Sequence, residues 1–300
     1  MRFIDFARLG RNSSGLYIGG IAVLILFFIL GGLPLLFDAN MRFPDLEIDI
    51  ENPAFIKAYG STRLLVGELL SFFLACVGFV WYLRAAHKRP LRSIFTAAPK
   101  FRWKRFFGFG LFLFLTVCLL TLLEVWWSGQ SDMLQWNFKT QEFWPLFFFS
   151  LLLIPFQAGI EELVFRVYAL QGLYLRTKNV WLSMGLSSAM FAIMHISNPE
   201  IEVLGPGLLL YYFMAGLFLA LLAVQDDGLE LSLAFHVFNN LFGAFMVTSN
   251  WQAFHTEALF IDERGPGSLL AQLATAVVIF VGLYFVLSKK FNWKPLTSLR

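Results

Sequence analysis

The amino-acid sequence predicts an all-α integral membrane protein with about eight transmembrane helices and both termini in the cytoplasm. Of its 300 residues, 58% are hydrophobic and only 14% are charged, whereas a soluble surface needs roughly a quarter of its residues charged. The apolar residues also form blocks of about twenty, the length of helix that spans a hydrocarbon core. These blocks are apolar on every face, which excludes the alternating pattern of a barrel. We find no internal repeat, so residues 1–300 are expected to form a single membrane domain.

The expected spans follow these blocks along the chain. They cover residues 16 to 37, 64 to 83, 106 to 127, 144 to 172, 180 to 198, 206 to 224, 229 to 248 and 268 to 288. The fourth block is longer than one straight crossing requires. Pro155 and Gly159 interrupt it, so we expect a kink or a break there. The sixth block follows Gly205, Pro206 and Gly207, which are typical of a turn that precedes a new helix.

The distribution of basic residues predicts the orientation. Most of the 23 lysines and arginines lie in the amino-terminal tail, the carboxyl-terminal tail and the loops that follow the second and fourth spans. Because basic residues resist translocation, these segments are expected in the cytoplasm. The loop that contains Asp226, Asp227 and Glu230 is also expected there, although no basic residue is near it in the sequence. Acidic residues have little weight in this rule.

The second half of the chain carries ionisable side chains at membrane depth, where each costs roughly 2.5 kcal/mol or more. They lie on three predicted helices within a core of about residues 143 to 248. The polar residues of this group are Glu161, Glu162 and Arg166 on the fourth span, His195 on the fifth, and His236 and Asn240 on the seventh. A group of this size on three helices predicts a functional site. His87 and His255, in contrast, lie in polar loops and are expected at a solvated surface.

Helical geometry gives the spacings a meaning. Glu162 and Arg166 are four residues apart, so they can pair on one face and reduce the cost of their burial. Glu161 projects about 100° away and is free to act as a general base. Phe191 and His195 have the same spacing, as do His236 and Asn240, so each helix presents one polar stripe. Because Glu161 and His195 are equidistant from the basic turn at residue 178, a helical hairpin brings them to similar depth.

These residue types suit the hydrolysis of a peptide bond. The reaction needs a base that deprotonates water, groups that hold the water, and donors that stabilise the oxyanion. Carboxylates and imidazoles supply the first two, and Asn240 can supply the third. Glu161, His195 and His236 could also bind zinc, which lowers the pKa of bound water. Water activated by glutamate without a metal is the alternative.

At these residues the chain resembles the CPBP family of intramembrane proteases, which includes type II CAAX prenyl endopeptidases and bacteriocin-processing or bacteriocin-immunity proteins. The family pattern is EExxxR, FxxxH and HxxxN on successive membrane helices. Its positions correspond to Glu161, Glu162 and Arg166, to Phe191 and His195, and to His236 and Asn240. The resemblance covers about residues 143 to 248 and all of the signature positions.

The resemblance implies an eight-helix fold with a site that opens to the cytoplasm. It implies that Glu161 is the base acting with His195, while His236 and Asn240 position water or stabilise the oxyanion. The expected partners are the lipid bilayer and a membrane-associated protein or peptide, of which a lipidated CAAX-type substrate is one class. No nucleic-acid partner is expected. The expected location is a membrane, the cell membrane if the source is prokaryotic.

Other classes of protein stay open at this point. A non-catalytic binding or immunity protein could share the motifs, because family membership does not prove turnover. A proton-coupled transporter would also bury such groups, but repeat-built transporters show related halves. A haem protein could use His195 and His236 as axial ligands, which leaves the two glutamates without a role.

Overall fold

The computed structural model describes residues 1–45, 48–49, 52–249, 251–253 and 256–299, and these residues form a bundle of helices. The longer helices are α1 (Ser14–Arg42), α3 (Ser61–Ala85), α5 (Trp103–Ser128), α6 (Thr140–Glu162), α7 (Leu170–Thr177), α8 (Val180–Ile193), α10 (Leu209–Gln225), α11 (Glu230–Leu241) and α12 (Leu269–Phe291). Two π-helical segments, η3 (Leu163–Ala169) and η5 (Phe242–Met246), continue α6 and α11. The short helices are η1 (Phe3–Leu9), α2 (Pro53–Tyr59), α4 (Leu91–Phe95), η2 (Ser131–Met133), α9 (Pro199–Leu204), η4 (Pro206–Leu208) and η6 (Leu296–Ser298).

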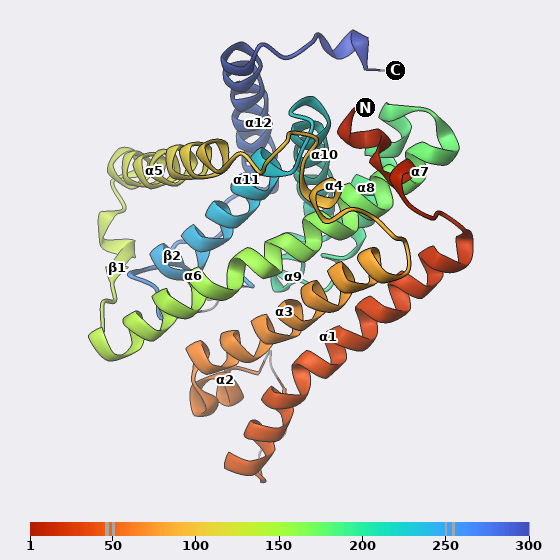
Figure 1. Ribbon diagram of the computed structural model, residues 1–300. Helices are drawn as coiled ribbons and strands as arrows, with labels where there is room; N and C mark the ends of the chain where they lie inside the picture. Colours follow the sequence, from red (N-terminus) through yellow and green to blue (C-terminus); the bar gives the residue numbers. More distant parts are fainter. Residues whose placement is uncertain (46–47, 50–51, 250, 254–255, 300) are drawn as a thin grey trace.

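The prediction of an all-α membrane protein is confirmed. Within the described ranges, six helical stretches are long and apolar enough to cross a membrane. The other two predicted spans correspond to α8 and α11, which are shorter, so the number of crossings stays a prediction. Both termini lie at the same end of the bundle (Figure 1), as an even number of crossings requires. The side of the membrane on which they lie also stays a prediction.

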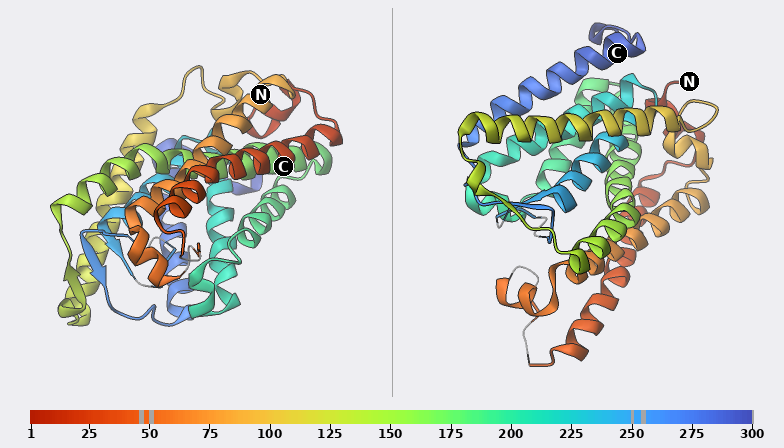
Figure 2. Two further views of the ribbon diagram at one scale, coloured as in Figure 1. Left: turned by 90° about the horizontal axis from the view of Figure 1, so that it is seen from below. Right: turned by 90° about the vertical axis from the view of Figure 1, so that its left-hand side faces the viewer.

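The helices lie in two groups. In the first, α1, α3, α6 and α11 lie side by side in that order, with α5 crossing beyond α11 (Figures 1 and 2). In the second, α10 packs against α8 and α12 and joins the first group through its contact with α11. The largest apolar core lies between these groups. The only strands in the described part are β1 (Leu134–Trp136), β2 (Val247–Thr248) and β3 (Phe260–Asp262), in the order β1-β3-β2.

The outer helices present apolar side chains to their surroundings. Ile18 on α1 is 69% exposed, Leu270 and Val278 on α12 are 77% and 72% exposed, and Leu115 on α5 is 58% exposed. Contiguous apolar surface of this extent is not stable in water. The surface therefore indicates that lipid surrounds these helices, in agreement with the composition.

The fourth predicted span contains a departure from the expected geometry. The expectation at Pro155 and Gly159 was a kink or a break; helix α6 continues through both residues, so the chain does not break there, and the kink stays a prediction. The irregularity begins at Leu163 instead, where the π-helical segment η3 follows Glu162 and leads into α7. A proline can lie within a membrane helix when neighbouring groups satisfy the freed carbonyl. Single π-helical turns frequently occur at functional sites, and this one begins directly after the two glutamates.

The fifth predicted span ends earlier than expected. The chain reverses at Lys178, as predicted, and α8 starts at Val180 with the Asn179 side chain as its cap. The helix ends at Ile193, so His195 lies in the following turn and not on the helix. Pro199 lies just beyond and disfavours helical geometry at the residue before it. The predicted span to residue 198 is therefore too long.

The acidic loop after α10 pairs with basic residues that are distant from it in the sequence. Arg102 Nη2 lies 2.7 Å from Glu230 Oε2 and 2.9 Å from Asp226 Oδ2, and Arg105 also pairs with Asp226. These arginines precede the acids by more than 120 residues along the chain. The loop is thus neutralised by the start of α5.

His87 is not at a solvated surface, so that expectation is wrong. Its side chain is 1% exposed, with Nδ1 bonded to the Arg11 carbonyl at 2.6 Å and Nε2 3.2 Å from the Tyr168 hydroxyl. Tyr17 and Tyr82 pack edge-on against its ring. Burial lowers the pKa of His87 below its usual value. His255 lies outside the described residues.

Candidate active site

Glu162 and Arg166 form a charge pair inside the bundle. Glu162 is fully buried and Arg166 is 1% exposed, with Arg166 Nε 3.4 Å from Glu162 Oε2. The guanidinium also donates from Nη2 to the Gly216 carbonyl at 3.2 Å and lies 4.7 Å from the centre of the Phe191 ring. Pairing reduces the cost of burying both charges. This pair thus holds Glu162 as a fixed carboxylate between α6, α8 and α10.

His236 lies between the two glutamates. Its Nδ1 is 3.0 Å from Glu162 Oε1, and its Nε2 is 3.6 Å from Glu161 Oε2. Because Glu162 is held as a carboxylate by Arg166, it accepts the Nδ1 proton of His236 and fixes the tautomer. The lone pair on Nε2 then faces Glu161. Buried Glu162 is therefore a positioning residue for the imidazole.

Of the two carboxylate oxygens of Glu161, one accepts a hydrogen bond and the other has no hydrogen-bond partner among the described residues. Gln157, one turn earlier on α6, donates to Glu161 Oε1 and accepts from Asn240 Nδ2 at 2.9 Å. Glu161 Oε2 is buried and has no hydrogen-bond partner among the residues that the structure describes. The 3.6 Å between this oxygen and His236 Nε2 exceeds a direct hydrogen bond, and such a gap between polar atoms suits a bridging water.

Gln157 is a candidate residue that the sequence reasoning did not find. It is 8% exposed and links Glu161 to Asn240 across α6 and α11. Its spacing of four residues from Glu161 was a signal for it, because residues at this spacing meet on a helix face. A neutral amide carries no charge at membrane depth, which is why attention to ionisable groups alone passes over it.

His195 and Phe191 complete the group from the other side. The Phe191 ring lies beside both imidazoles, with its centre 4.5 Å from that of the His195 ring and 6.1 Å from that of the His236 ring. His195 Nδ1 lies 2.7 Å from the Phe191 carbonyl, and Tyr212 stacks on the imidazole at 4.3 Å. Because Nδ1 donates to a carbonyl, Nε2 of His195 carries the lone pair.

The structure thus brings the predicted residues together with a different pairing. Within the described ranges, the imidazole that faces Glu161 is that of His236, and no hydrogen bond or ion pair joins Glu161 to His195. Asn240 lies near the glutamate through Gln157. Its neighbour Asn239 donates to Asn240 Oδ1 at 3.4 Å. Carboxylate, imidazole and amide groups from α6, α11 and the turn after α8 therefore lie in one region.

The predicted zinc ligands do not form a ligand set in this arrangement. Zinc requires its protein ligands at about 2.0–2.2 Å from one point, yet in the described part of the chain no three His, Cys, Asp or Glu side chains come together in this way. The Nδ1 atom of His236 is also occupied by Glu162, which leaves only its Nε2 atom for a metal. Zinc binding by Glu161, His195 and His236 therefore has no preformed ligand set among the described residues and stays a prediction.

Comparisons with known proteins agree with the motifs. A family described as type II CAAX prenyl endopeptidase Rce1-like matches residues 141–242, a range that includes all seven signature residues. The protein YyaK of Bacillus subtilis, described as uncharacterized, is 26% identical over 296 residues, which cover 95% of this chain and 96% of YyaK. No solved structure matches the chain. The predicted resemblance is confirmed: residues 141–242 are similar to the Rce1-like type II CAAX prenyl endopeptidase family.

Proposed function

We propose that the protein is an intramembrane endopeptidase in which Glu161 and His236 activate a water molecule for attack on a peptide bond. The single observation that carries the proposal is the gap between Glu161 Oε2 and His236 Nε2, 3.6 Å wide and closed in by buried groups. A water in this gap has two acceptors for its protons. The Rce1-like domain over residues 141–242 supports the reaction class.

In the proposed reaction, Glu161 takes a proton from the water as its oxygen bonds to the carbonyl carbon of the substrate. His236 accepts the second hydrogen bond of the water and orients it. The oxyanion that forms is stabilised by the Asn240 amide, which turns from Gln157 to the substrate. Glu161 then gives its proton to the amine nitrogen as the carbon–nitrogen bond breaks. The products are a new carboxyl terminus and a new amino terminus, and Glu161 returns to its starting state.

His195 has a separate place in this proposal. Its ring is fixed by the Phe191 carbonyl and by Tyr212, and it is partly exposed. Its Nε2 is therefore available to a bound substrate on the side opposite His236. We assign it to substrate positioning and proton exchange with the leaving amine. The substrate class that we propose is a membrane-associated protein or peptide, and a lipidated CAAX-type terminus is one form of it.

The test is a comparison of membrane proteins from cells that carry wild-type protein or Glu161→Gln. The substitution keeps the shape of the side chain and removes the base. Glu142→Gln is the matched control, because Glu142 lies on the same helix, is 47% exposed and pairs with Lys139 at the surface. We expect at least one membrane-associated protein to accumulate uncleaved with Glu161→Gln and to be processed with wild type and control. Identical terminal peptides in all three samples would contradict proteolysis and favour a non-catalytic binding protein.

A further inference from the structure

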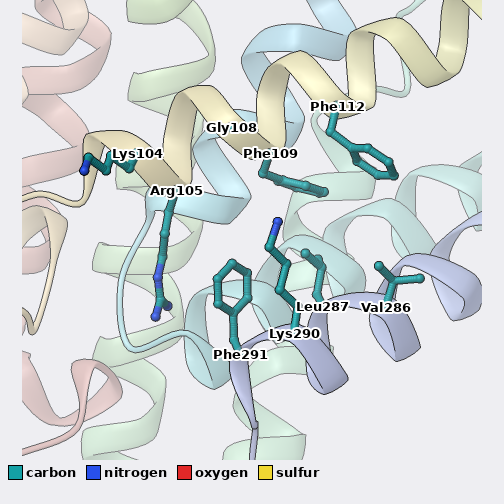
Figure 3. A pocket seen from close by; sticks show the side chains of 9 residues that line it. All are labelled: Lys104, Arg105, Gly108, Phe109, Phe112, Val286, Leu287, Lys290 and Phe291. Atoms are coloured by element: carbon teal, nitrogen blue, oxygen red, sulfur yellow. The ribbon is translucent and has the colours of Figure 1, made fainter.

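A pocket outside the candidate active site lies between the first turns of α5 and the last turns of α12. It has a volume of about 260 Å³ and is lined by Lys104, Arg105, Gly108, Phe109, Phe112, Val286, Leu287, Lys290 and Phe291. Figure 3 shows the basic residues of α5 at one end and Phe112 with Val286 at the other, with Lys290 reaching from α12 toward Phe109. The pocket therefore has a cationic end and an apolar end.

The cations at this pocket are not equivalent. Arg105 already has an acidic partner, because it pairs with Asp226. Its guanidinium also lies 4.2 Å from the centre of the Phe291 ring. Lys104 and Lys290 have no acidic partner among the residues that the structure describes, and Lys290 Nζ has only the Phe291 ring at 5.7 Å. Two lysines that line the pocket thus lack an acidic partner among the described residues. An anion is the ligand that this end of the pocket favours.

The position of the pocket at the membrane interface indicates which anion can reach it. Trp103, which precedes Lys104, is 60% exposed, and an exposed tryptophan at a helix end is typical of the membrane interface. The apolar residues Phe112 and Val286 are 48% and 53% exposed and face outward from the bundle. A lipid at this site would have its phosphate at the interface and its chain along these side chains.

We propose that the pocket binds an anionic glycerophospholipid, with the phosphate between Lys104 and Lys290 and an acyl chain along Phe109, Phe112 and Val286. Basic pockets between membrane helices bind anionic lipid headgroups through the same combination of charge and apolar wall. A bilayer supplies such lipids at high local concentration. The lipid bridges α5 and α12, which have few direct contacts with each other and pack separately on α11 and α10.

The first test measures which lipid the purified full-length protein retains. Native mass spectrometry after exchange into phosphatidylglycerol or phosphatidylcholine gives the retained lipid directly. Combined Lys104→Gln and Lys290→Gln removes the unpaired cations. Combined Lys100→Gln and Lys289→Gln is the matched control, because these exposed lysines flank the pocket without lining it. We expect the pocket variant to lose phosphatidylglycerol by roughly tenfold or more, given the contribution of each basic residue to anionic lipid binding, and the control to retain it.

A second pair of variants tests the apolar wall without a change of charge. A Cβ atom at Gly108 or at Gly282 meets no other atom within 4 Å, so a side chain can start from either site without a clash. Gly108→Leu fills the pocket, whereas Gly282→Leu lies on the outer face of α12. We expect only Gly108→Leu to release phosphatidylglycerol.

Three results would overturn the proposal. They are equal retention of phosphatidylglycerol by the pocket and control variants, equal retention of the two lipids by wild type, and displacement of the lipid by excess inorganic phosphate, which would indicate a site for the free anion. The readout is lipid mass and not proteolysis, so the outcome is independent of the proposed function.

Discussion

Removal of one partner from the Glu162–Arg166 pair is expected to destabilise the protein strongly. Glu162→Gln removes the paired carboxylate and leaves the buried guanidinium of Arg166 with the Gly216 carbonyl and two aromatic rings in contact with it. Because the side chains are 0% and 1% exposed, solvent does not compensate. A broken buried pair costs about 3–5 kcal/mol. For a chain of this size that corresponds to a fall of roughly 6–10 °C in apparent melting temperature.

The assay is thermal unfolding of the purified protein in detergent, with a double variant to isolate the coupling. Glu162→Gln with Arg166→Met removes both charges, so we expect it to be more stable than Glu162→Gln alone. Glu142→Gln is the surface control: its partner Lys139 is 3.3 Å away and 56% exposed, and its loss should change stability by less than about 1 kcal/mol. Equal melting temperatures for wild type and Glu162→Gln, or fully additive effects in the double variant, would refute the reasoning.

Three further predictions concern other parts of the chain. Gln157→Leu removes the link between Glu161 and Asn240, so kcat should fall roughly tenfold to a hundredfold with little change in KM; wild-type kcat would exclude the positioning role. Thermal stability should decline as the pH falls below about 6.5. The reason is that His87 binds a proton in the unfolded chain at this pH, whereas burial lowers its pKa in the folded protein and keeps it neutral. His87→Gln should show a flatter dependence of melting temperature on pH, and an unchanged slope would contradict this. Gly31→Ala adds a Cβ 2.6 Å from the Ser71 Cα on α3 and should cost about 1–3 kcal/mol in thermal unfolding, whereas Gly282→Ala, which meets no atom, should be neutral.

The apolar blocks predicted the helices well, because a helix in lipid requires about twenty consecutive apolar residues. Predicted span 64 to 83, for example, lies inside α3, and predicted span 268 to 288 begins at Ser268, the N-cap of α12. Short elements were not predicted. The π-helical segment after Glu162 depends on packing against neighbouring helices, and β3 pairs with β1 from more than 120 residues away. Local propensity carries no signal for either.

In the candidate site, too, contacts within one helix were predicted and contacts between distant segments were not. Spacings of four residues correctly predicted the contact between Glu162 and Arg166. The partner of Glu161 was not predictable in this way, because His195 and His236 come from different segments of the chain, and the packing of α11 on α6 brings His236 to Glu161. His87 was misplaced for a related reason: its polar loop folds back onto Tyr17 and Tyr168, which are distant in sequence. The charges around Asp226 were likewise satisfied from α5.

The most direct test of the central claim is single-turnover cleavage by purified protein in nanodiscs, using a substrate identified by the comparison of membranes. Glu161→Gln, His236→Ala and Glu142→Gln are measured beside wild type, with melting temperatures to verify folding. Loss of a general base should lower the rate by roughly a hundredfold or more. We expect this loss for Glu161→Gln, a similar loss for His236→Ala, and wild-type cleavage for Glu142→Gln. Cleavage by folded Glu161→Gln at the wild-type rate would contradict the account.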